Sequence, residues 1–590
     1  MSVNHAFPMD RAEDQEARRR FPSVWKLVVP YWKTRDGLLS LLMLAYVLAA
    51  GWGHTYVAVW LNRWTGTFYD AIGAGKFQLL PHLLFVFLMV AMIASAFTMS
   101  TVILQSIVEI RWRRWLTTWL VDEWMARHTY YRIERDRSLE NVDQRIAEDA
   151  RQFVKDTLLL VMGGLQVPVS IVSFSVILWN IGGPLKFSLG GASHTVRGYL
   201  VMAAFLYQGV IFAGTHYLGR RLITLNAKQN RVEGDFRVLM VRVREFAEQI
   251  AFFKGQSAEG NRLGEAFRHV VSNLYSLLWV NTRVGLFTNI VGQVSPVIPT
   301  LLVLPQLLSG GLSLGGLMRS NGAFGSVTSA LSFFPQAYLG FASWRAEANR
   351  LREFLYVNDI EQRAGIVTNL EMKGLVAASS LVLRDADSAT IAFVPDFMLT
   401  PGARCIVRGR SGSGKSTLLR ALAGLWPYGE GTVNRSADGG MFVPQRSYIP
   451  PGTLKGAIAY PCEESAYSDS QCADVLRACG LGAYVASMHE TDRWSSRLSG
   501  GEQQRVAFAR VLLANPSTVF LDECTSALDT ESERELYQLL IERLPRATVV
   551  SVAHRKELSA FHSSTLDFPP RETTDSGDRT VLPLHRVFPA

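Results

Sequence analysis

Charged residues are missing from long intervals in the N-terminal part of the chain. Six stretches contain no Asp, Glu, Lys or Arg, and no stretch of similar length occurs afterwards. A membrane-spanning helix needs about 20 apolar residues, and each stretch is long enough. The absence argues against a soluble fold for this part and predicts six spans: Gly37–Asn62, Phe77–Val108, Thr157–Leu185, Gly198–Gly219, Val284–Met318 and Ser320–Trp344.

Cysteine is scarce, and no cleavable leader sequence is predicted. All five cysteines lie in the C-terminal part without metal-ligand spacing, which is typical of structural thiols in a reduced cytosolic domain: Cys405, Cys462, Cys472, Cys479 and Cys524. The first 36 residues lack a compact apolar region with a cleavage site, so no cleavable signal peptide is predicted. The aromatic residues, prolines and lysines of Phe21–Lys33 favour an interfacial segment.

Basic residues are nearly missing from alternate connections between the predicted spans. Lysine and arginine are abundant in the N-terminal segment and in the connections Glu109–Asp156 and Arg220–Arg283, and they are few in the other connections. By the positive-inside rule, both termini and the two basic connections are cytoplasmic. The net charge of +9 is therefore explained by membrane orientation rather than by nucleic-acid binding.

The two basic connections contain no proline and few glycines. Apolar residues recur at helical spacing in Arg111–Met125 and Asn230–Phe253. We therefore expect the spans to continue past the bilayer as cytoplasmic helices. Each pair would end in a short exposed turn, in place of a long solvated loop.

Acidic residues are absent within the predicted spans, and Glu109 and Asp156 stand only at span ends. Uncharged polar residues remain as candidates to line a cavity, although such residues also serve to join helices: His54, His216, Asn289, Gln166 and Gln293. Pro296, Pro299 and Pro305 would permit a bend in the fifth span.

The soluble part follows a polar helix at Ser343–Val357. Short apolar strands alternate there with helical stretches, an α/β pattern. The predicted fold class is an α-helical polytopic membrane domain followed by an α/β domain. The predicted boundaries are an N-terminal cytoplasmic and interfacial segment (1–36), the membrane domain (37–357), a linker (358–369), the α/β domain (370–568) and a tail (569–590).

A phosphate-binding loop is the first chemical motif of the soluble part. The pattern G-x-x-x-x-G-K-[ST] lies between a strand and a helix, the context that confirms it. Its glycines let backbone N–H groups surround the phosphates, Lys415 reaches the β- and γ-phosphates, and Ser416 offers a hydroxyl to Mg²⁺. The predicted ligands are ATP and Mg²⁺, and the predicted contacts are Gly409, Arg410, Ser411, Gly412, Ser413, Gly414, Lys415, Ser416 and Thr417.

Two adjacent carboxylates form the second motif. They end the apolar strand Ser517–Glu523. Asp522 is placed to hold the Mg²⁺ shell, and Glu523 is placed to polarise the attacking water.

Four further motifs, in the expected order, resemble those of the ATP-binding cassette (ABC) family. Leu498–Arg505 (LSGGEQQR) resembles the ABC signature, Gln445 the Q-loop, Ser526–Asp529 the D-loop and His554 the H-switch. The resemblance implies that Gln445 and His554 act with Glu523 in ATP hydrolysis, and that Gln445 also contacts Mg²⁺.

The signature raises the question of a second chain. Its Ser-Gly-Gly step stands at a helix start, where free N–H groups suit an anion. In ABC ATPases the signature of one domain completes the ATP site of another. The resemblance therefore implies a half-transporter that works as a homodimer, with Ser499, Gly500, Gly501 and Asp529 contacting the nucleotide of the partner subunit. One departure is that Leu383–Phe397 offers no clear aromatic to stack on adenine, and Phe393 is predicted to lie in the strand core.

The membrane half narrows the family. Asn141–Asp149 (NVDQRIAED) resembles the Asn-Pro-Asp-Gln-Arg motif of SbmA/BacA-like and peroxisomal subfamily D proteins, and Glu245–Glu259 resembles their second connection. The resemblance is greatest to bacterial YddA-like members. It implies an exporter-type architecture in which 141–149 and 245–259 transmit force between the two domains.

The expected function is ATP-driven transport of peptides or other bulky hydrophilic compounds by a multi-pass protein of the bacterial inner membrane, with the nucleotide-binding domain in the cytoplasm. Uptake is the expected direction. Alternatives are an exporter, a fatty acyl or lipid-type transporter, and proton-coupled peptide uptake with an accessory ATPase. The lack of acids within the spans disfavours proton coupling, and the spans exclude a soluble ATPase acting on nucleic acid. The expected partners are a second identical subunit, the lipid bilayer and the cargo.

Overall fold

The computed structural model describes residues 21–189, 192–359, 365–438, 440–553, 555–568 and 585–586. The chain divides into two compact units, 1–360 and 361–590, and each is considered separately. The N-terminal twenty residues, most of the tail beyond 568, part of the predicted linker and His554 lie outside the described residues.

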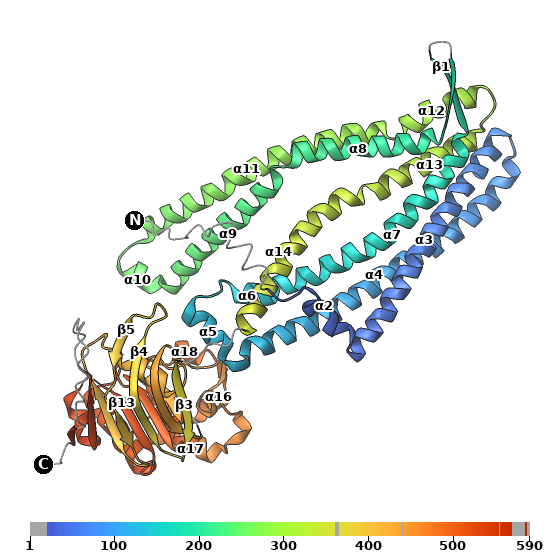
Figure 1. Cartoon of the computed structure of the whole chain (residues 1–590). Coiled ribbons are helices and arrows are strands. Elements are labelled where there is room, and N and C mark those ends of the chain that lie inside the picture. Colours follow the sequence, from blue (N-terminus) through green and yellow to red (C-terminus); the bar gives the residue numbers. More distant parts are fainter. Residues whose placement is uncertain are drawn as a thin grey trace. The chain divides into compact units, whose positions relative to one another are not determined.

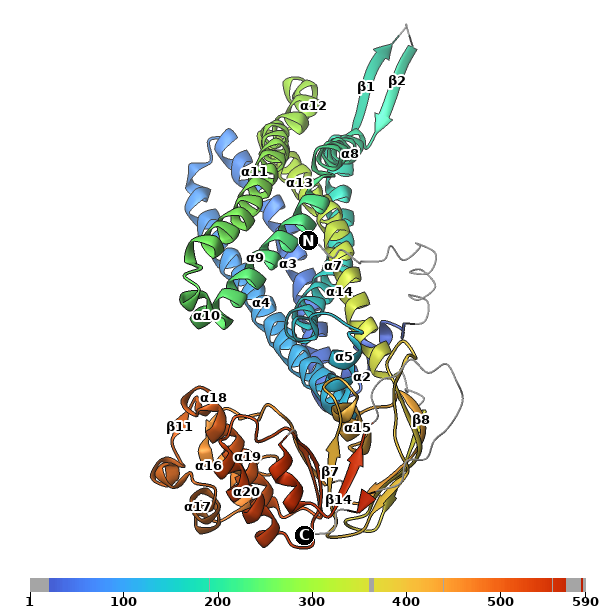
Figure 2. The same cartoon turned by 90° about the vertical axis from the view of Figure 1, so that its left-hand side faces the viewer.

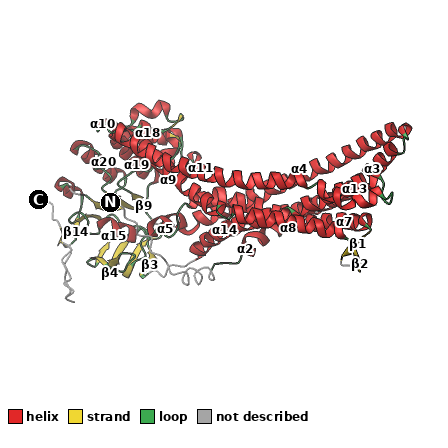
Figure 3. Cartoon of the chain, turned by 90° about the horizontal axis from the view of Figure 1, so that it is seen from above, coloured by secondary structure: helices red, strands yellow, loops and turns green. Residues whose placement is uncertain are grey.

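The first unit consists of helices and one β-hairpin (Figures 1 and 3). Its elements are α2 (Trp25–Trp32), α3 (Arg35–Gly73), η1 (Phe77–Leu79), α4 (Leu80–Met125), η2 (Ala126–His128), α5 (Thr129–Asp136), α6 (Val142–Gln144), η3 (Arg145–Asp149), α7 (Ala150–Gly182), β1 (Pro184–Leu189), β2 (Ala192–Arg197), α8 (Tyr199–Gly219), α9 (Leu222–Glu245), α10 (Ala247–Phe252), α11 (Gln256–Val294), α12 (Val297–Leu308), α13 (Leu314–Leu331) and α14 (Phe333–Asp359).

Several of these helices are much longer than a bilayer is thick. Helix α4 has 46 residues, which gives a length of about 69 Å at 1.5 Å per residue, against about 30 Å for the hydrocarbon core. Helix α11 has 39 residues. The expected continuation of the spans into long cytoplasmic helices is therefore seen in both connections.

Five helical segments of the described chain are long and apolar enough to cross a membrane: Arg35–Gly73, Phe77–Asp136, Val142–Gly182, Tyr199–Gly219 and Gln256–Leu308. The sixth predicted span, Ser320–Trp344, is helical but is divided between α13 and α14 at Ser332. Its glycines, serines and threonine lower its hydropathy and allow close packing. A Cβ built on Gly322 would lie 2.8 Å from Asn62 Nδ2, so this part of α13 packs closely on α3. A sixth crossing stays a prediction.

Two further features separate the spans. The predicted bend occurs where α11 ends and α12 begins after Pro296. The hairpin β1–β2 between α7 and α8 is antiparallel and was not predicted. Within this unit, the hairpin lies at one end of the helices and α10 lies at the other (Figures 1 and 2), as expected for external and cytoplasmic connections.

The first cytoplasmic turn is fastened to α14. Arg145 Nη1 donates to the backbone oxygen of Arg350 at 2.9 Å and to Glu353 Oε2 at 2.7 Å. Arg350 in turn donates two hydrogen bonds to the Asp149 carboxylate, at 2.6 and 2.7 Å. Residues 145–149 form a π-helix, a feature that is frequent at functional sites.

The second cytoplasmic turn is different because it ends in exposed aromatic side chains. Phe252 and Phe253 are 77% and 87% exposed, at the end of the short helix α10. Exposed phenylalanines at a helix–helix turn are unusual on a solvated surface and are typical of a contact site.

The second unit combines a six-stranded sheet, a five-stranded sheet and the two-stranded pair β10–β11 with flanking helices (Figure 3). Its elements are β3 (Ile366–Glu371), β4 (Val376–Arg384), β5 (Thr390–Phe393), β6 (Phe397–Leu399), β7 (Arg404–Arg408), α15 (Lys415–Leu422), β8 (Gly429–Ser436), β9 (Met441–Val443), β10 (Gly452–Thr453), α16 (Leu454–Ala459), η4 (Glu464–Ala466), α17 (Asp469–Ala478), η5 (Gly482–Ser487), β11 (Thr491–Asp492), α18 (Trp494–Arg497), α19 (Gly500–Ala514), β12 (Thr518–Asp522), α20 (Thr530–Arg543), β13 (Thr548–Val552), η6 (Lys556–Phe561), β14 (Ser564–Asp567) and β15 (His585–Arg586).

The larger sheet places the chemistry. Its order is β15-β14-β7-β13-β12-β9, and β14, β7, β13, β12 and β9 run parallel. Strands β12 and β13 are buried along their whole length, as expected for central strands of a parallel sheet that is covered on both faces. Ligands of such sheets bind beyond the carboxyl ends of the strands, where the loops after β7, β9 and β12 carry the predicted site residues.

Candidate functional site

The phosphate loop joins β7 to α15 and depends on its glycines. Gly412 and Gly414 have φ values of +79° and +98°, and a Cβ on Gly414 would lie 2.9 Å from Ile391 Cγ2. Only glycine adopts this left-handed backbone without cost in so narrow a space. The loop backbone can therefore turn its N–H groups toward an anion.

The polar groups of the loop fit a nucleotide triphosphate. The Lys415 side chain is directed into the loop, where its Nζ donates to the backbone oxygens of Gly409 and Arg410, both at 2.9 Å. The buried Ser413 hydroxyl has no hydrogen-bond partner among the described residues. A cation and an unsatisfied hydroxyl in a glycine-rich loop are donors that phosphate oxygens need.

Two residues of the predicted cation site are in contact. Ser416 Oγ donates to Asp522 Oδ1 at 3.0 Å, which joins the start of α15 to the end of β12. Burial raises the pKa of Asp522 above its ordinary value, and the hydrogen bond from Ser416 acts in the opposite direction. A hydroxyl and a carboxylate are ligands that Mg²⁺ prefers, so these residues are suited to hold it.

Glu523 follows directly and has an unusual backbone. Its φ is +48°, a left-handed conformation that costs a non-glycine residue about 1 kcal/mol or more. The conformation is held by its N–H, which donates to the backbone oxygen of Val552 at 3.0 Å. Gln445, exposed after β9, donates from Nε2 to Glu523 Oε2 at 3.2 Å. The structure therefore brings the predicted base and the predicted Q-loop residue together.

The signature begins helix α19. Ser499 is its N-cap and forms a reciprocal capping box with Glu502, and Ser499 and Gly500 are exposed. A Cβ on Gly501 would lie 3.2 Å from Leu528 Cδ2 and 3.4 Å from the backbone oxygen of Ala527. The signature thus packs against the D-loop.

Gln504 strengthens that contact, since its Oε1 accepts a hydrogen bond from the Ala527 backbone N–H at 3.0 Å. Asp529 ends the D-loop as the N-cap of α20, accepting from the Ser532 N–H at 2.8 Å. Within the described residues, no hydrogen bond or ion pair joins the signature or Asp529 to the phosphate loop of the same subunit.

The remaining predicted residues are placed less tightly. Arg410, Ser411 and Gly412 are exposed at the tip of the phosphate loop, and Thr417 is half-buried on α15. The assignment of His554 lies outside the described residues. The prediction for Phe393 is wrong, because this side chain at the end of β5 is 61% exposed instead of packed in the strand core.

One residue beside the site was missed. Arg510 on α19 is buried, and its guanidinium donates to the backbone oxygens of Ala457 and Tyr448 and lies over the Tyr460 ring at 5.2 Å. Tyr448 follows Gln445 by three residues, so Arg510 connects the signature helix to the Q-loop segment. An arginine in a helical run gives no signal of this in the sequence.

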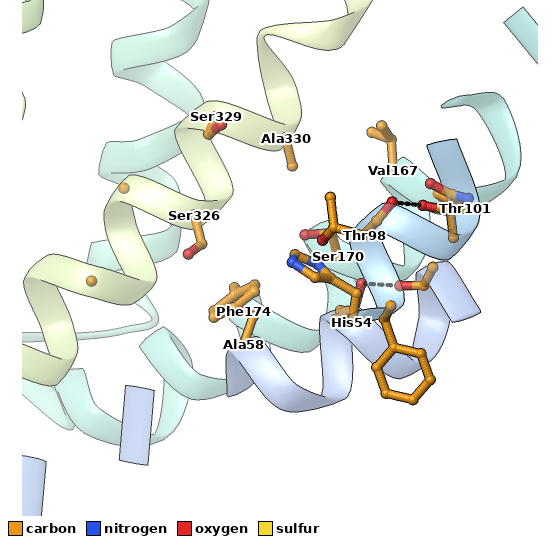
Figure 4. Close-up of a pocket in the computed structure, with 16 residues that line it drawn as sticks. His54, Ala58, Thr98, Thr101, Val167, Ser170, Phe174, Ser326, Ser329 and Ala330 are labelled. Atoms are coloured by element: carbon orange, nitrogen blue, oxygen red, sulfur yellow. Dashed lines mark hydrogen bonds between the residues drawn. The ribbon is translucent and has the colours of Figure 1, made fainter. Parts of the chain in front are cut away.

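The membrane unit holds a cavity of about 620 Å³ between α3, α4, α7 and α13. Its described lining contains no Asp, Glu, Lys or Arg, and polar groups come from His54, Gln166 and six hydroxyl side chains: Thr55, Thr98, Thr101, Ser170, Ser326 and Ser329. In Figure 4, Ser326 and Ser329 on α13 lie across the cavity from His54 and Ser170.

The three threonines of this cavity can accept further hydrogen bonds. Thr55, Thr98 and Thr101 donate to backbone oxygens of their own helices, which leaves their lone pairs to accept. Among the residues predicted to line a cavity, His54 and Gln166 do so. His216 stacks on Phe212 of its own helix, and Asn289 donates to Gly285 of its own helix.

Comparison with known proteins identifies both halves. Residues 24–308 match the family described as ABC transporter transmembrane region 2, and residues 394–526 match the family described as ABC transporter. The chain is 33% identical over 536 residues to the inner membrane ABC transporter ATP-binding protein YddA of Escherichia coli, covering 90% of this chain and 94% of that protein. The chain belongs to the ABC transporter family.

More distant relatives come from the subfamily D group. This ABC transporter is 28% identical to ABC transporter D family member 2, chloroplastic, of Arabidopsis thaliana, over 93% of this chain and 86% of that protein. It is 26% identical to the human lysosomal cobalamin transporter ABCD4, over 94% and 95% of the two chains. These relatives confirm the predicted group.

A solved structure of a bacterial Atm1-family ABC exporter with ATP bound has a TM-score of 0.70 at 21% identity, covering 91% of this chain and 93% of that one. It shows that the fold is of the exporter type. Together with the family matches, these findings confirm a helical membrane domain with an α/β ABC domain that couples ATP hydrolysis to transport. The predicted location in the inner membrane as a multi-pass protein is likewise confirmed.

Proposed function

We propose that this ABC transporter is a homodimeric half-transporter that takes up peptides or other bulky hydrophilic compounds across a bacterial inner membrane. The observation that carries the cargo class is the lining of the cavity between α3, α4, α7 and α13. Its hydroxyls, His54 and Gln166 offer hydrogen bonds without fixed charge. Such a lining suits amide and hydroxyl groups, and gives an acyl chain no advantage over the surrounding lipid.

The name of one relative is consistent with a polar cargo. The human relative is named a cobalamin transporter, and cobalamin is a bulky hydrophilic compound. The uptake direction follows the resemblance to SbmA/BacA-like proteins, and the exporter-type fold does not fix direction, because fold does not imply function.

The homodimer is supported by the arrangement of the ATPase unit. Ser499 and Gly500 are exposed at the start of α19, and the described chain shows no contact between them and its own phosphate loop. A second copy would bring its signature and Asp529 to the nucleotide. We further propose that Ser416, Asp522 and Gln445 hold Mg²⁺, that residues 409–417 hold the phosphates, and that Glu523 is the general base assisted by Gln445 and His554.

The proposal is tested in sealed vesicles that contain the purified full-length protein. ATP is supplied on the side of the ATPase unit, and a labelled neutral peptide is followed in the wild type and in Glu523→Gln. ATP-dependent accumulation on the ATP side supports uptake, and accumulation on the other side overturns the direction. Transport of a labelled fatty acyl compound in place of the peptide would overturn the cargo class.

A variant in the cavity lining tests whether the cavity between α3, α4, α7 and α13 binds the cargo. Ser326→Leu removes a hydroxyl and fills space, so peptide movement should fall strongly while basal ATP hydrolysis is retained. Ser332→Leu, at the break between α13 and α14 and outside the cavity lining, is the matched control. Equal loss in both variants would contradict a cargo site at this cavity.

A further inference from the structure

Three buried carboxyl groups lie together where α7 and the π-helix η3 pack on α14. Asp149, Asp156 and Glu347 are only 4%, 8% and 6% exposed, and α14 contacts both other elements. Glu347 follows the predicted sixth span by three residues, so the cluster lies at the cytoplasmic boundary of the membrane domain. Neither the ATP site nor the cavity uses it.

The three carboxyls are unequally compensated. Arg350 donates both of its hydrogen bonds to Asp149, at 2.6 and 2.7 Å. Asp156 Oδ1 accepts from Gln152 Nε2 at 2.9 Å. Glu347 Oε2 is buried and has no hydrogen-bond partner within the described part of the chain. An ionised carboxylate in that position would be strongly disfavoured, whereas a neutral carboxylic acid costs much less.

The acidic groups around Glu347 also favour its protonated form. The groups that act on Glu347 are Arg350 on its own helix, Glu148 and Asp149 on η3, and Asp156 on α7. Burial is the largest effect, the charge of Asp156 comes next, and together they raise the pKa of Glu347 from 4.5 to about 7, against the opposing effect of Arg350. This carboxyl therefore changes charge near neutral pH.

We propose that Glu347 is a proton-binding site of the transport cycle, protonated in the packing seen here and deprotonated when α14 shifts against α7 and water reaches the carboxyl group. On that shift the O–H bond breaks, its electron pair stays on the carboxylate, and the proton passes to water; the return shift reverses the transfer. The proposal rests on the proposed function, because α7 both lines the cavity and carries Asp156 beside Glu347, and opening the cavity to alternate sides requires its walls to move. Helix α14 is also the segment that leads directly into the ATPase unit.

The proton is located by infrared titration of the full-length protein in nanodiscs without nucleotide. The carbonyl band of a protonated carboxylic acid should disappear with a midpoint near pH 7 in the wild type. It should be missing in Glu347→Gln and kept in Glu265→Gln, an exposed glutamate on α11. Asp156→Asn should move the midpoint to lower pH. Survival of the band in Glu347→Gln, or its loss in Asp156→Asn, would overturn the assignment.

The link to the cycle is tested by repeating the titration of Glu523→Gln with and without ATP and Mg²⁺, while nucleotide binding is measured in the same sample. ATP should lower the midpoint by about one pH unit or more, a tenfold change in proton affinity. Binding of ATP without a shift overturns the coupling. Absence of ATP binding would instead overturn the proposed nucleotide site, and the nucleotide-free titration would still decide whether Glu347 holds the proton.

Discussion

Replacing Glu523 by Gln gives the sharpest test of the ATP site. The amide has the shape of the carboxylate, its oxygen can still accept from Gln445 Nε2, and the backbone bond to Val552 is unchanged, so folding should be retained. Loss of a positioned general base lowers turnover by about 10²–10⁴-fold. Nucleotide binding should be kept, because the phosphate loop and Asp522 are untouched.

Gln445→Ala removes the hydrogen-bond partner of the base and, with it, the Mg²⁺ contact proposed for Gln445. A hydrogen bond to a charged group contributes about 1.5–3 kcal/mol, and at 3.2 Å the lower figure applies, which corresponds to about a tenfold loss of turnover. Both variants are compared with the wild type by ATP turnover and by equilibrium binding of labelled ATP in nanodiscs. Normal turnover in Glu523→Gln, or a loss in Gln445→Ala as large as in Glu523→Gln, would refute the reasoning.

Three further predictions concern stability, each measured by thermal unfolding of the full-length protein. Gly414→Ala should destabilise the ATPase unit by about 1–2 kcal/mol and weaken ATP binding, since φ is +98° and Ile391 is 2.9 Å from the new methyl group; ATP that protects this variant as well as the wild type would contradict it. Arg510→Ala should cost about 1–3 kcal/mol by leaving the buried carbonyl group of Ala457 without its guanidinium donor, and an unchanged midpoint would show that water replaces the guanidinium. Burial lowers the pKa of His562 from 6.5 to about 4, so the unfolded chain binds the proton more tightly and stability is lost as pH falls from 6.5 toward 4, by up to about 3 kcal/mol; His562→Gln should remove this dependence, and the exposed His489→Gln should not.

Much of the fold is predictable because its signals are local. The absence of charge over bilayer-length intervals indicates spans, and the phosphate loop sits between a strand and a helix as its spacing requires. The sixth interval is less clear because serine and glycine in α13 serve helix packing and so weaken the hydropathy signal. The hairpin β1–β2 was missed because its short strands lie in a segment that resembles an ordinary external loop.

The site residues are harder to predict from the sequence where their contacts depend on the tertiary structure. The pairs Ser416–Asp522 and Gln445–Glu523 follow from motif order, since the carboxyl ends of parallel strands share one edge. Arg510 and Glu347 carry no motif, because their roles depend on which side chains lie opposite them. Asp156 is an example: in the sequence it is only an acidic residue at the end of a span, and its effect on Glu347 depends on the packing of α7 against α14.

The hydrogen bonds of Arg145 and Asp149 to α14 bear on how this protein can be recombined with its relatives. A chimera that exchanges the membrane domain at the end of the last span would separate the first cytoplasmic turn from Arg350 and Glu353. It would place a foreign helix against a turn shaped for another one. The unit of exchange is therefore the turn together with the whole of α14, and a viable junction belongs after Asp359, beyond the point at which the chain has left the bilayer.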